Sequence, residues 1–155
     1  NKNVIKRGDM QYTCAGSGIT HSETNNSPAK PLRFVQIWIQ PNAERLPPRY
    51  VSNHFTRKKR LNKLLQIASG QKMDDVTQVN QDTNIFVSEI EAGGQIRIEQ
   101  LPTRQIYLAC LEGSLRINDV SLQNGDAAKI RGEAALNFMA IEDCLSIIVE
   151  IPGSD

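Results

Sequence analysis

The chain of 155 residues lacks an apolar run of about 18 residues, the length that crosses a bilayer as a helix. Its most apolar stretch, 145–151, is interrupted by Ser146 and Glu150 and has the length of a strand. No basic and then apolar leader opens the sequence, and its first residue is Asn1 rather than methionine. We therefore expect no membrane span, and we interpret the start at Asn1 as the result of processing or excision.

Cysteine is scarce and odd in number. Cys14, Cys110 and Cys144 follow no spacing typical of a metal site, which excludes a disulfide scaffold and a zinc ribbon. Each lies in an apolar stretch, so we predict three buried and unpaired thiols. Unpaired thiols are typical of a reducing compartment, and we expect a cytoplasmic protein.

Acidic residues are almost absent from the first half of the chain. Residues 1–72 contain 13 Lys/Arg and 3 Asp/Glu, a net charge of +10, whereas residues 73–155 contain 5 and 14, a net charge of −9. This asymmetry predicts two structural units that attract one another. The basic run 57–60 is open to two interpretations, a nucleic-acid site or a face in contact with solvent or with the acidic half. No aromatic platform accompanies the run, so we favour the second and expect no nucleic-acid partner.

Short β-rich runs separated by turn residues dominate the sequence, which favours an antiparallel sandwich or barrel. Only 57–69 has a helical period, and there we expect a short helix or a linker. The strands that we expect span 10–14, 33–39, 85–90, 95–99, 105–111, 114–118, 127–130, 135–141 and 144–151.

A weak internal repeat supports two β units, because Gly8-Asp9 and Gly125-Asp126 each precede an expected strand. We predict a tight turn at both positions. The glycine would adopt a positive φ, and the aspartate would accept hydrogen bonds from nearby backbone amides.

Histidine is nearly absent too, and only His21 and His54 are present. On a strand, His21 and Glu23 would point to the same face, where an imidazole and a carboxylate can both bind a transition metal. Two ligands are fewer than the roughly three that a catalytic metal site takes from the protein. His54 has no acidic neighbour in the sequence to orient its ring, so we interpret it as a surface residue.

The segments that carry the most specific pattern are MQYTCAGSGITHSETN at 10–25, LRFVQIWIQP at 32–41 and PRY at 48–50. Together they resemble the pirin family of bicupins, and the resemblance covers the whole chain. It implies an all-β fold of cupin-type β-barrels (jelly rolls). Residues 1–50 would be the closing part of an incomplete N-terminal barrel, 51–72 a basic linker or short helix, and 73–155 a complete C-terminal barrel.

The resemblance also implies a function. Pirins hold one divalent metal, usually iron, with three histidines and a glutamate, and two of these ligands match His21 and Glu23 here. Glu23 would also be catalytic, by accepting the hydroxyl proton of a flavonol-like substrate in a quercetin 2,3-dioxygenase reaction. The family's His-x-His pair is absent from these 155 residues. We therefore expect the chain alone to bind metal weakly and to be inactive.

The second barrel offers no replacement site. If the chain is shifted so that Gly8 falls on Gly125, His21 falls on Phe138 and Glu23 on Ala140. We therefore expect an apolar, structural interior there.

An alternative is a non-catalytic interaction or regulatory module that acts through barrel surfaces and oligomerisation. An incomplete barrel exposes unpaired strand edges, so we expect a homodimer or a companion chain.

Overall fold

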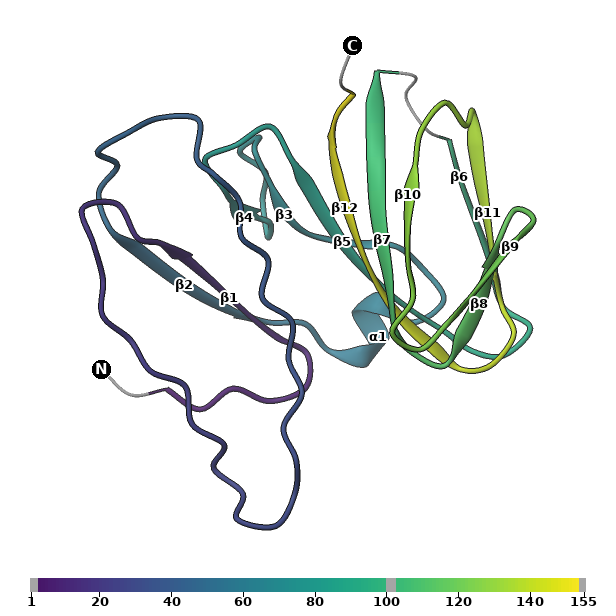
Figure 1. The fold of residues 1–155 in the computed structure, drawn as a ribbon, viewed down its shortest axis with the longest axis horizontal. Coiled ribbons are helices and arrows are strands. Elements are labelled where there is room, and N and C mark those ends of the chain that lie inside the picture. The colour runs from purple at the N-terminus through teal and green to yellow at the C-terminus, as the bar shows by residue number, and fades with distance from the viewer. Residues whose placement is uncertain (1–2, 100–102, 154–155) are drawn as a thin grey trace.

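Figure 1 shows the computed structural model of the chain, which describes residues 3–99 and 103–153. Over these residues the chain forms twelve strands in three sheets and one helix, α1 (Arg57–Arg60). The all-β fold expected from the sequence is confirmed. No helix in the described part of the chain could cross a bilayer.

The largest sheet has six strands, and its centre is the long strand β12, which pairs antiparallel with both β5 and β7. Among the described strands, only the pairing of β3 with β4 is parallel. In spatial order the strands are β10 (Ala127–Ile130), β7 (Arg104–Glu112), β12 (Cys144–Pro152), β5 (Asn84–Ile90), β3 (Leu65–Ser69) and β4 (Thr77–Gln78).

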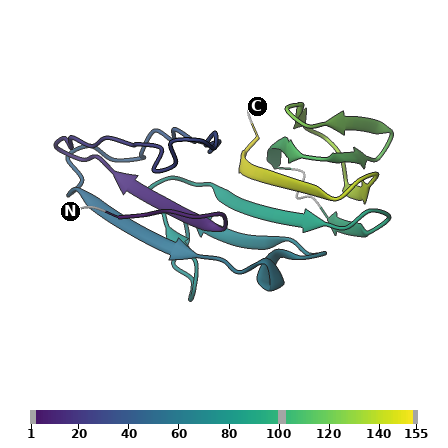
Figure 2. The same ribbon diagram turned by 90° about the horizontal axis from the view of Figure 1, so that it is seen from below.

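A four-stranded antiparallel sheet faces this one across an apolar core (Figure 2). Its strands alternate buried and exposed residues, as in β8, where Leu115 and Ile117 are buried and Arg116 is exposed. The spatial order is β6 (Gln95–Glu99), β11 (Ala135–Ala140), β8 (Ser114–Ile117) and β9 (Val120–Gln123).

The core between these sheets is made of aliphatic and aromatic side chains from both layers. Leu115 and Leu136 come from the four-stranded sheet, and Leu108 and Ile148 from the six-stranded sheet. Each such side chain contributes about 1.5–3 kcal/mol to stability when it is fully buried. Phe138 and Ala140 belong to the same cluster, so the apolar interior predicted for the second barrel is confirmed.

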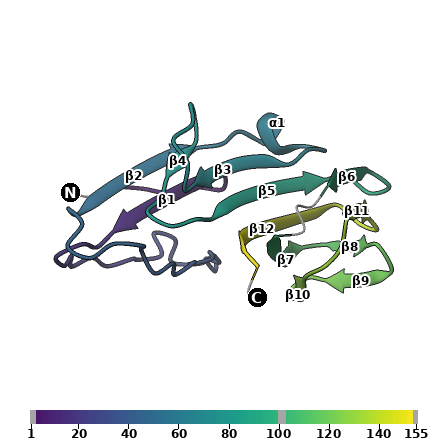
Figure 3. The same ribbon diagram turned by 90° about the horizontal axis from the view of Figure 1, so that it is seen from above.

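The N-terminal part of the chain forms an antiparallel hairpin of β1 (Asp9–Cys14) and β2 (Arg49–His54). The hairpin lies beside the β3–β4 edge of the six-stranded sheet (Figures 1 and 3). Met10 and Tyr12 of β1 pack against a second buried cluster, formed by Phe55, Ile67, Ala68, Val79 and Ile85. The molecule therefore has two cores, and the six-stranded sheet contributes to both.

The Gly-Asp repeat has the geometry predicted for it. Gly8 and Gly125 have φ of 92° and 96°. Asp9 accepts a hydrogen bond from the backbone amide of Lys6 at 2.7 Å, and Asp126 accepts the matching bond from Gln123 at 2.9 Å. The same turn therefore precedes β1 and β10.

Ion pairs join the basic N-terminal part to the acidic C-terminal part, as the charge asymmetry predicts. Arg57 and Arg60 of α1 both contact Glu89 on β5. Arg7 binds Glu112 with two hydrogen bonds of 2.5 and 2.7 Å, and this contact lowers the pKa of the Glu112 carboxyl. For the two arginines of the 57–60 run, contact with the acidic half is the correct interpretation.

In the range 57–69, where we expected a short helix or a linker, only residues 57–60 form a helix, α1. Residues 65–69 form β3 instead, with Ile67 and Ala68 buried in the second core. Leu61, Leu64 and Leu65 follow the helical period but are only half-buried. Residues 65–69 satisfy their backbone instead by pairing with β5. Three further strands, β2, β4 and β9, were not predicted, since they are short or rich in polar residues.

The strand expected over 33–39 is also absent, and these residues have no regular structure. The run is rich in residues that favour strands, but such residues form a strand only where a neighbour supplies ladder hydrogen bonds. No described segment pairs with it.

The three cysteines are free and buried, as predicted. Burial, with a smaller contribution from Cys144, raises the pKa of the Cys110 thiol from 9.0 to about 11. The Cys110 thiol therefore loses its proton at a lower pH in the unfolded chain than in the folded protein. As a result, the free energy of unfolding falls as the pH rises from about 9 towards 11. We expect an extra loss of about 1 kcal/mol between pH 8 and pH 10 relative to Cys110→Ala, measured by urea denaturation. Equal losses in the two proteins would contradict this assignment.

Candidate metal centre

Residues 15–48 connect β1 to β2 as one long loop, called here the 15–48 loop, which contains no helix or strand. Figure 1 shows it running down from the end of β1 and back up towards β2 as two separate legs. Most of its large apolar side chains are exposed, and Trp38 is 92% exposed, although Ile39 packs against the second buried cluster. The exposed set within the loop is Ile19, Leu32, Phe34, Val35, Ile37 and Trp38. The loop therefore presents an apolar surface that no described residue covers.

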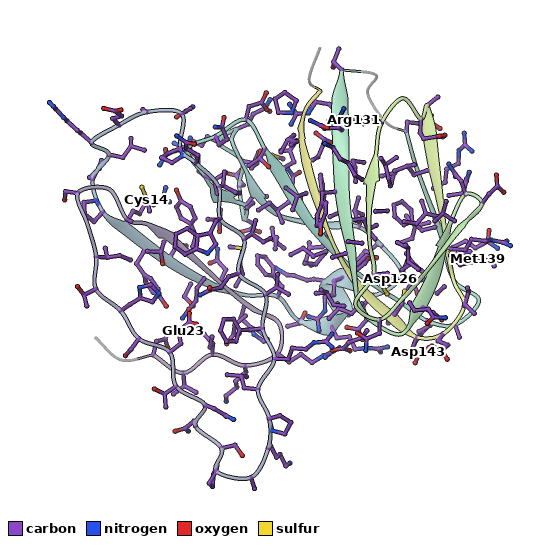
Figure 4. The ribbon with its side chains drawn as sticks, in the orientation of Figure 1. Cys14, Glu23, Asp126, Arg131, Met139 and Asp143 are labelled. Atoms are coloured by element: carbon purple, nitrogen blue, oxygen red, sulfur yellow. The ribbon has the colours of Figure 1, made fainter. Side chains whose placement is uncertain are left out.

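The two candidate ligands, His21 and Glu23, lie on the first leg of this loop, and both are exposed. Figure 4 shows Glu23 on the other side of the view from Asp126 and Asp143, which lie immediately before β10 and β12. One long contact of 3.4 Å joins Glu23 Oε2 to the side-chain amide of Gln36 on the second leg. The carboxylate is thus accessible and only weakly held.

The donor set of this segment fits a first-row transition metal only in part. An imidazole nitrogen and a carboxylate oxygen suit iron or nickel. A catalytic site takes about three ligands from the protein, and nowhere in residues 3–99 and 103–153 do three His, Cys, Asp or Glu side chains gather. His21 and Glu23 alone are therefore fewer donors than a catalytic metal site requires, and no third such side chain joins them among the described residues.

His54 has an acidic partner that sequence reasoning missed. Its Nδ1 lies 2.5 Å from Oδ1 of Asp9, which is 45 residues away in the sequence but directly opposite in the β1–β2 register. The His54 contact, assisted by the backbone amide of Lys6, lowers the pKa of the Asp9 carboxyl. Only a correct prediction of β2 and its pairing with β1 would have revealed this pair.

Comparison with models of known protein families shows to which family the chain belongs. Residues 66–151 match the quercetinase C-terminal cupin domain, and residues 1–39 match the pirin model. This chain belongs to the pirin family. The resemblance read from 10–25, 32–41 and 48–50 is confirmed, and the sandwich of β3–β12 corresponds to a C-terminal cupin domain.

Two curated pirin relatives extend the match along nearly the whole chain. The chain is 32% identical to a pirin-like protein of Caulobacter vibrioides over 151 residues, which cover 97% of this chain and 65% of that protein. It is 28% identical to quercetin 2,3-dioxygenase of Escherichia coli K12, covering 98% of this chain and 64% of that enzyme. The chain therefore spans about 65% of the length of such relatives.

A solved pirin has the same fold. The bacterial pirin YhhW of Escherichia coli, in complex with nickel(II), superposes with a TM-score of 0.89 at 27% identity. The match covers 99% of this chain and 66% of that one. Over nearly its whole length, the chain thus has the fold of a solved pirin.

Proposed function

We propose that this chain is part of a metal-dependent dioxygenase of the quercetin 2,3-dioxygenase type, with a flavonol-like substrate. The proposal is supported by the enzyme named among its pirin relatives and by the nickel(II) in YhhW. The observation that carries it is the placement of His21 and Glu23 together on an exposed leg of the 15–48 loop, where both side chains are free to bind a metal.

His21 would supply a neutral imidazole nitrogen to a divalent first-row metal, and Glu23 a carboxylate oxygen. The bound metal would supply Lewis-acid or redox chemistry for the reaction with dioxygen. Glu23 would have a second role as the acceptor of the substrate hydroxyl proton, because a carboxylate near a bound hydroxyl can act as a general base. The sequence resemblance favours iron and the solved relative holds nickel, so both ions belong in the test.

Gln36 would orient Glu23 for this role, since its amide already reaches Glu23 Oε2 from the opposite leg. The exposed apolar side chains of Phe34 and Trp38 would then form part of the wall against which an aromatic substrate packs. The remaining ligands would come from sequence outside these 155 residues, since the relatives are longer. The 155-residue chain alone would accordingly show no turnover.

The test is metal affinity in a full-length protein that carries this sequence. We expect His21→Ala to weaken binding of nickel(II) and iron(II) by about 100-fold or more, because a direct ligand contributes at least as much as the outer-shell groups that support it. His54→Ala is the matched control, since His54 is the other histidine of the chain and pairs with Asp9. Calorimetric titration measures both, and equal affinities for the His21 variant and the wild type would contradict the ligand assignment.

A second function, an interaction or regulatory module, is favoured by the uncovered apolar side chains of the 15–48 loop. Such a surface suits a second copy of the chain or a companion chain. Oxygen uptake with quercetin separates the two functions. A full-length protein that binds metal, consumes no oxygen and forms a discrete dimer would support the module and contradict the dioxygenase.

A further inference from the structure

A pocket of about 230 Å³ lies between strand β2 and the turn that leads into β4. Figure 1 shows these two strands side by side, at the place where the N-terminal hairpin meets the six-stranded sheet. None of the lining residues belongs to the 15–48 loop, so the pocket is separate from His21 and Glu23. The lining is Arg49, Val51, Asn53, His54, Phe55, Lys59, Asp75, Val76 and Thr77.

The charge of the lining is predominantly positive. Arg49 and Lys59 are permanent cations at neutral pH, and Asp75 is the single carboxylate among the lining residues. Lys59 belongs to the basic run 57–60, in which Arg60 pairs with Glu89, and Arg57 pairs with both Glu89 and Glu91. Lys59 forms no ion pair with any other described residue. Its charge is therefore available to a ligand.

The polar side chains of the pocket are held in place and leave donors free. Asn53 donates its amide to Thr77 Oγ1 at 2.8 Å, so the Thr77 hydroxyl proton can be donated to a ligand. The ring of His54 is fixed through Nδ1 by Asp9 at 2.5 Å. Its Nε2 can donate to an anion when the ring carries a second proton. Four side chains from three segments can therefore supply N–H or O–H groups to one ligand: Arg49, His54, Lys59 and Thr77.

The size of the pocket limits the ligand. Pockets for drug-sized molecules measure about 300–1,000 Å³, and this one is smaller. A flavonol is therefore too large to be enclosed here. A small oxyanion with several acceptor oxygens matches both the volume and the donors, because guanidinium and ammonium groups form their strongest hydrogen bonds with phosphate and carboxylate oxygens.

We propose that this pocket is a binding site for a phosphate group, either free phosphate or the phosphate of a small ester, held by Arg49, Lys59, His54 and Thr77. A metal cation is disfavoured, since one carboxylate faces two cationic side chains. The ligand would bridge β2, α1 and the turn before β4, which are the elements that join the hairpin to the cupin domain. Bound phosphate would therefore stabilise this junction.

The test is calorimetric titration of the 155-residue chain with inorganic phosphate and, separately, with glycerol 3-phosphate, at constant ionic strength. We expect saturable binding at one site with millimolar or tighter affinity. Lys59→Met is expected to weaken it by about tenfold, and the double variant Arg49→Met/Lys59→Met to abolish it. Equal affinity for both ligands would identify free phosphate, and tighter binding of the ester would identify a phosphorylated metabolite.

Lys58→Met is the matched control, because Lys58 is the neighbour of Lys59 in α1, carries the same charge and does not line the pocket. It should bind phosphate as the wild type does. Equal weakening by Lys58→Met and Lys59→Met would overturn the proposal, since it would indicate non-specific attraction to the basic run. Failure of the wild type to saturate would also overturn it. Circular dichroism of each variant establishes that it is folded.

Discussion

Replacing Gly113 by alanine is expected to lower the free energy of unfolding by about 4 kcal/mol. Gly113 is the turn residue between β7 and β8, with φ of 68°, where a side chain strains the backbone. A Cβ there would also lie 2.0 Å from the backbone oxygen of Asp143, and backbone cannot rotate away as a flexible side chain can. Strain and overlap therefore act together. Urea denaturation followed by circular dichroism measures the loss.

Gly125→Ala is the control that separates these two effects. Gly125 has φ of 96°, but a Cβ at this position would meet no atom within 4 Å. We expect a loss of about 1–2 kcal/mol from backbone strain alone. Equal losses for Gly113→Ala and Gly125→Ala would mean that the contact with Asp143 relaxes at little cost.

Replacing Glu89 by glutamine is expected to destabilise the protein by about 3 kcal/mol. The Glu89 carboxylate binds Arg60, whose side chain is only 7% exposed, and also Arg57. Arg60 donates in addition to the backbone oxygen of Phe55, which holds the end of β2 against α1. Without the carboxylate, the Arg60 charge stays buried with no counter-charge, and a lone buried charge is costly.

Glu91→Gln is the matched control for this second substitution. Glu91 also pairs with Arg57, but at 3.4 Å and with half of both side chains exposed. Exposed pairs contribute about 0.2–1 kcal/mol, so the expected loss is small. If urea denaturation gave Glu89→Gln and Glu91→Gln the same midpoint, the buried pair would not be what fastens α1 to β5.

Most strands of the cupin domain were predictable because each shows a recognisable local sequence pattern. β6 (Gln95–Glu99) and β10 (Ala127–Ile130) have the predicted bounds, since turn residues flank runs that are half buried on a single sheet face. The strands β2, β4 and β9 lack this local pattern and were missed. β2 (Arg49–His54) is polar on both sides, and it is a strand because β1 lies opposite it across 34 intervening residues.

The candidate site was predictable only where its residues lie close together in the sequence. His21 and Glu23 are two residues apart and belong to a specific family segment, so both could be named from the sequence. The Asp9–His54 pair and the phosphate pocket could not, because their residues come from β1, β2, α1 and the turn before β4. Those elements meet only through hairpin register and through packing of the second core.

The exposure of Trp38 has a consequence for optical measurements on this protein. Trp38 is the single tryptophan of the chain and lies on the 15–48 loop, outside both buried clusters. Its fluorescence emission therefore changes when another molecule covers the loop, and it changes little when the cupin domain unfolds. Unfolding curves from emission and from circular dichroism will not coincide, even where the cupin domain itself unfolds in one cooperative step. The protein thus carries a natural fluorophore for the arrival of a substrate or a companion chain at the loop.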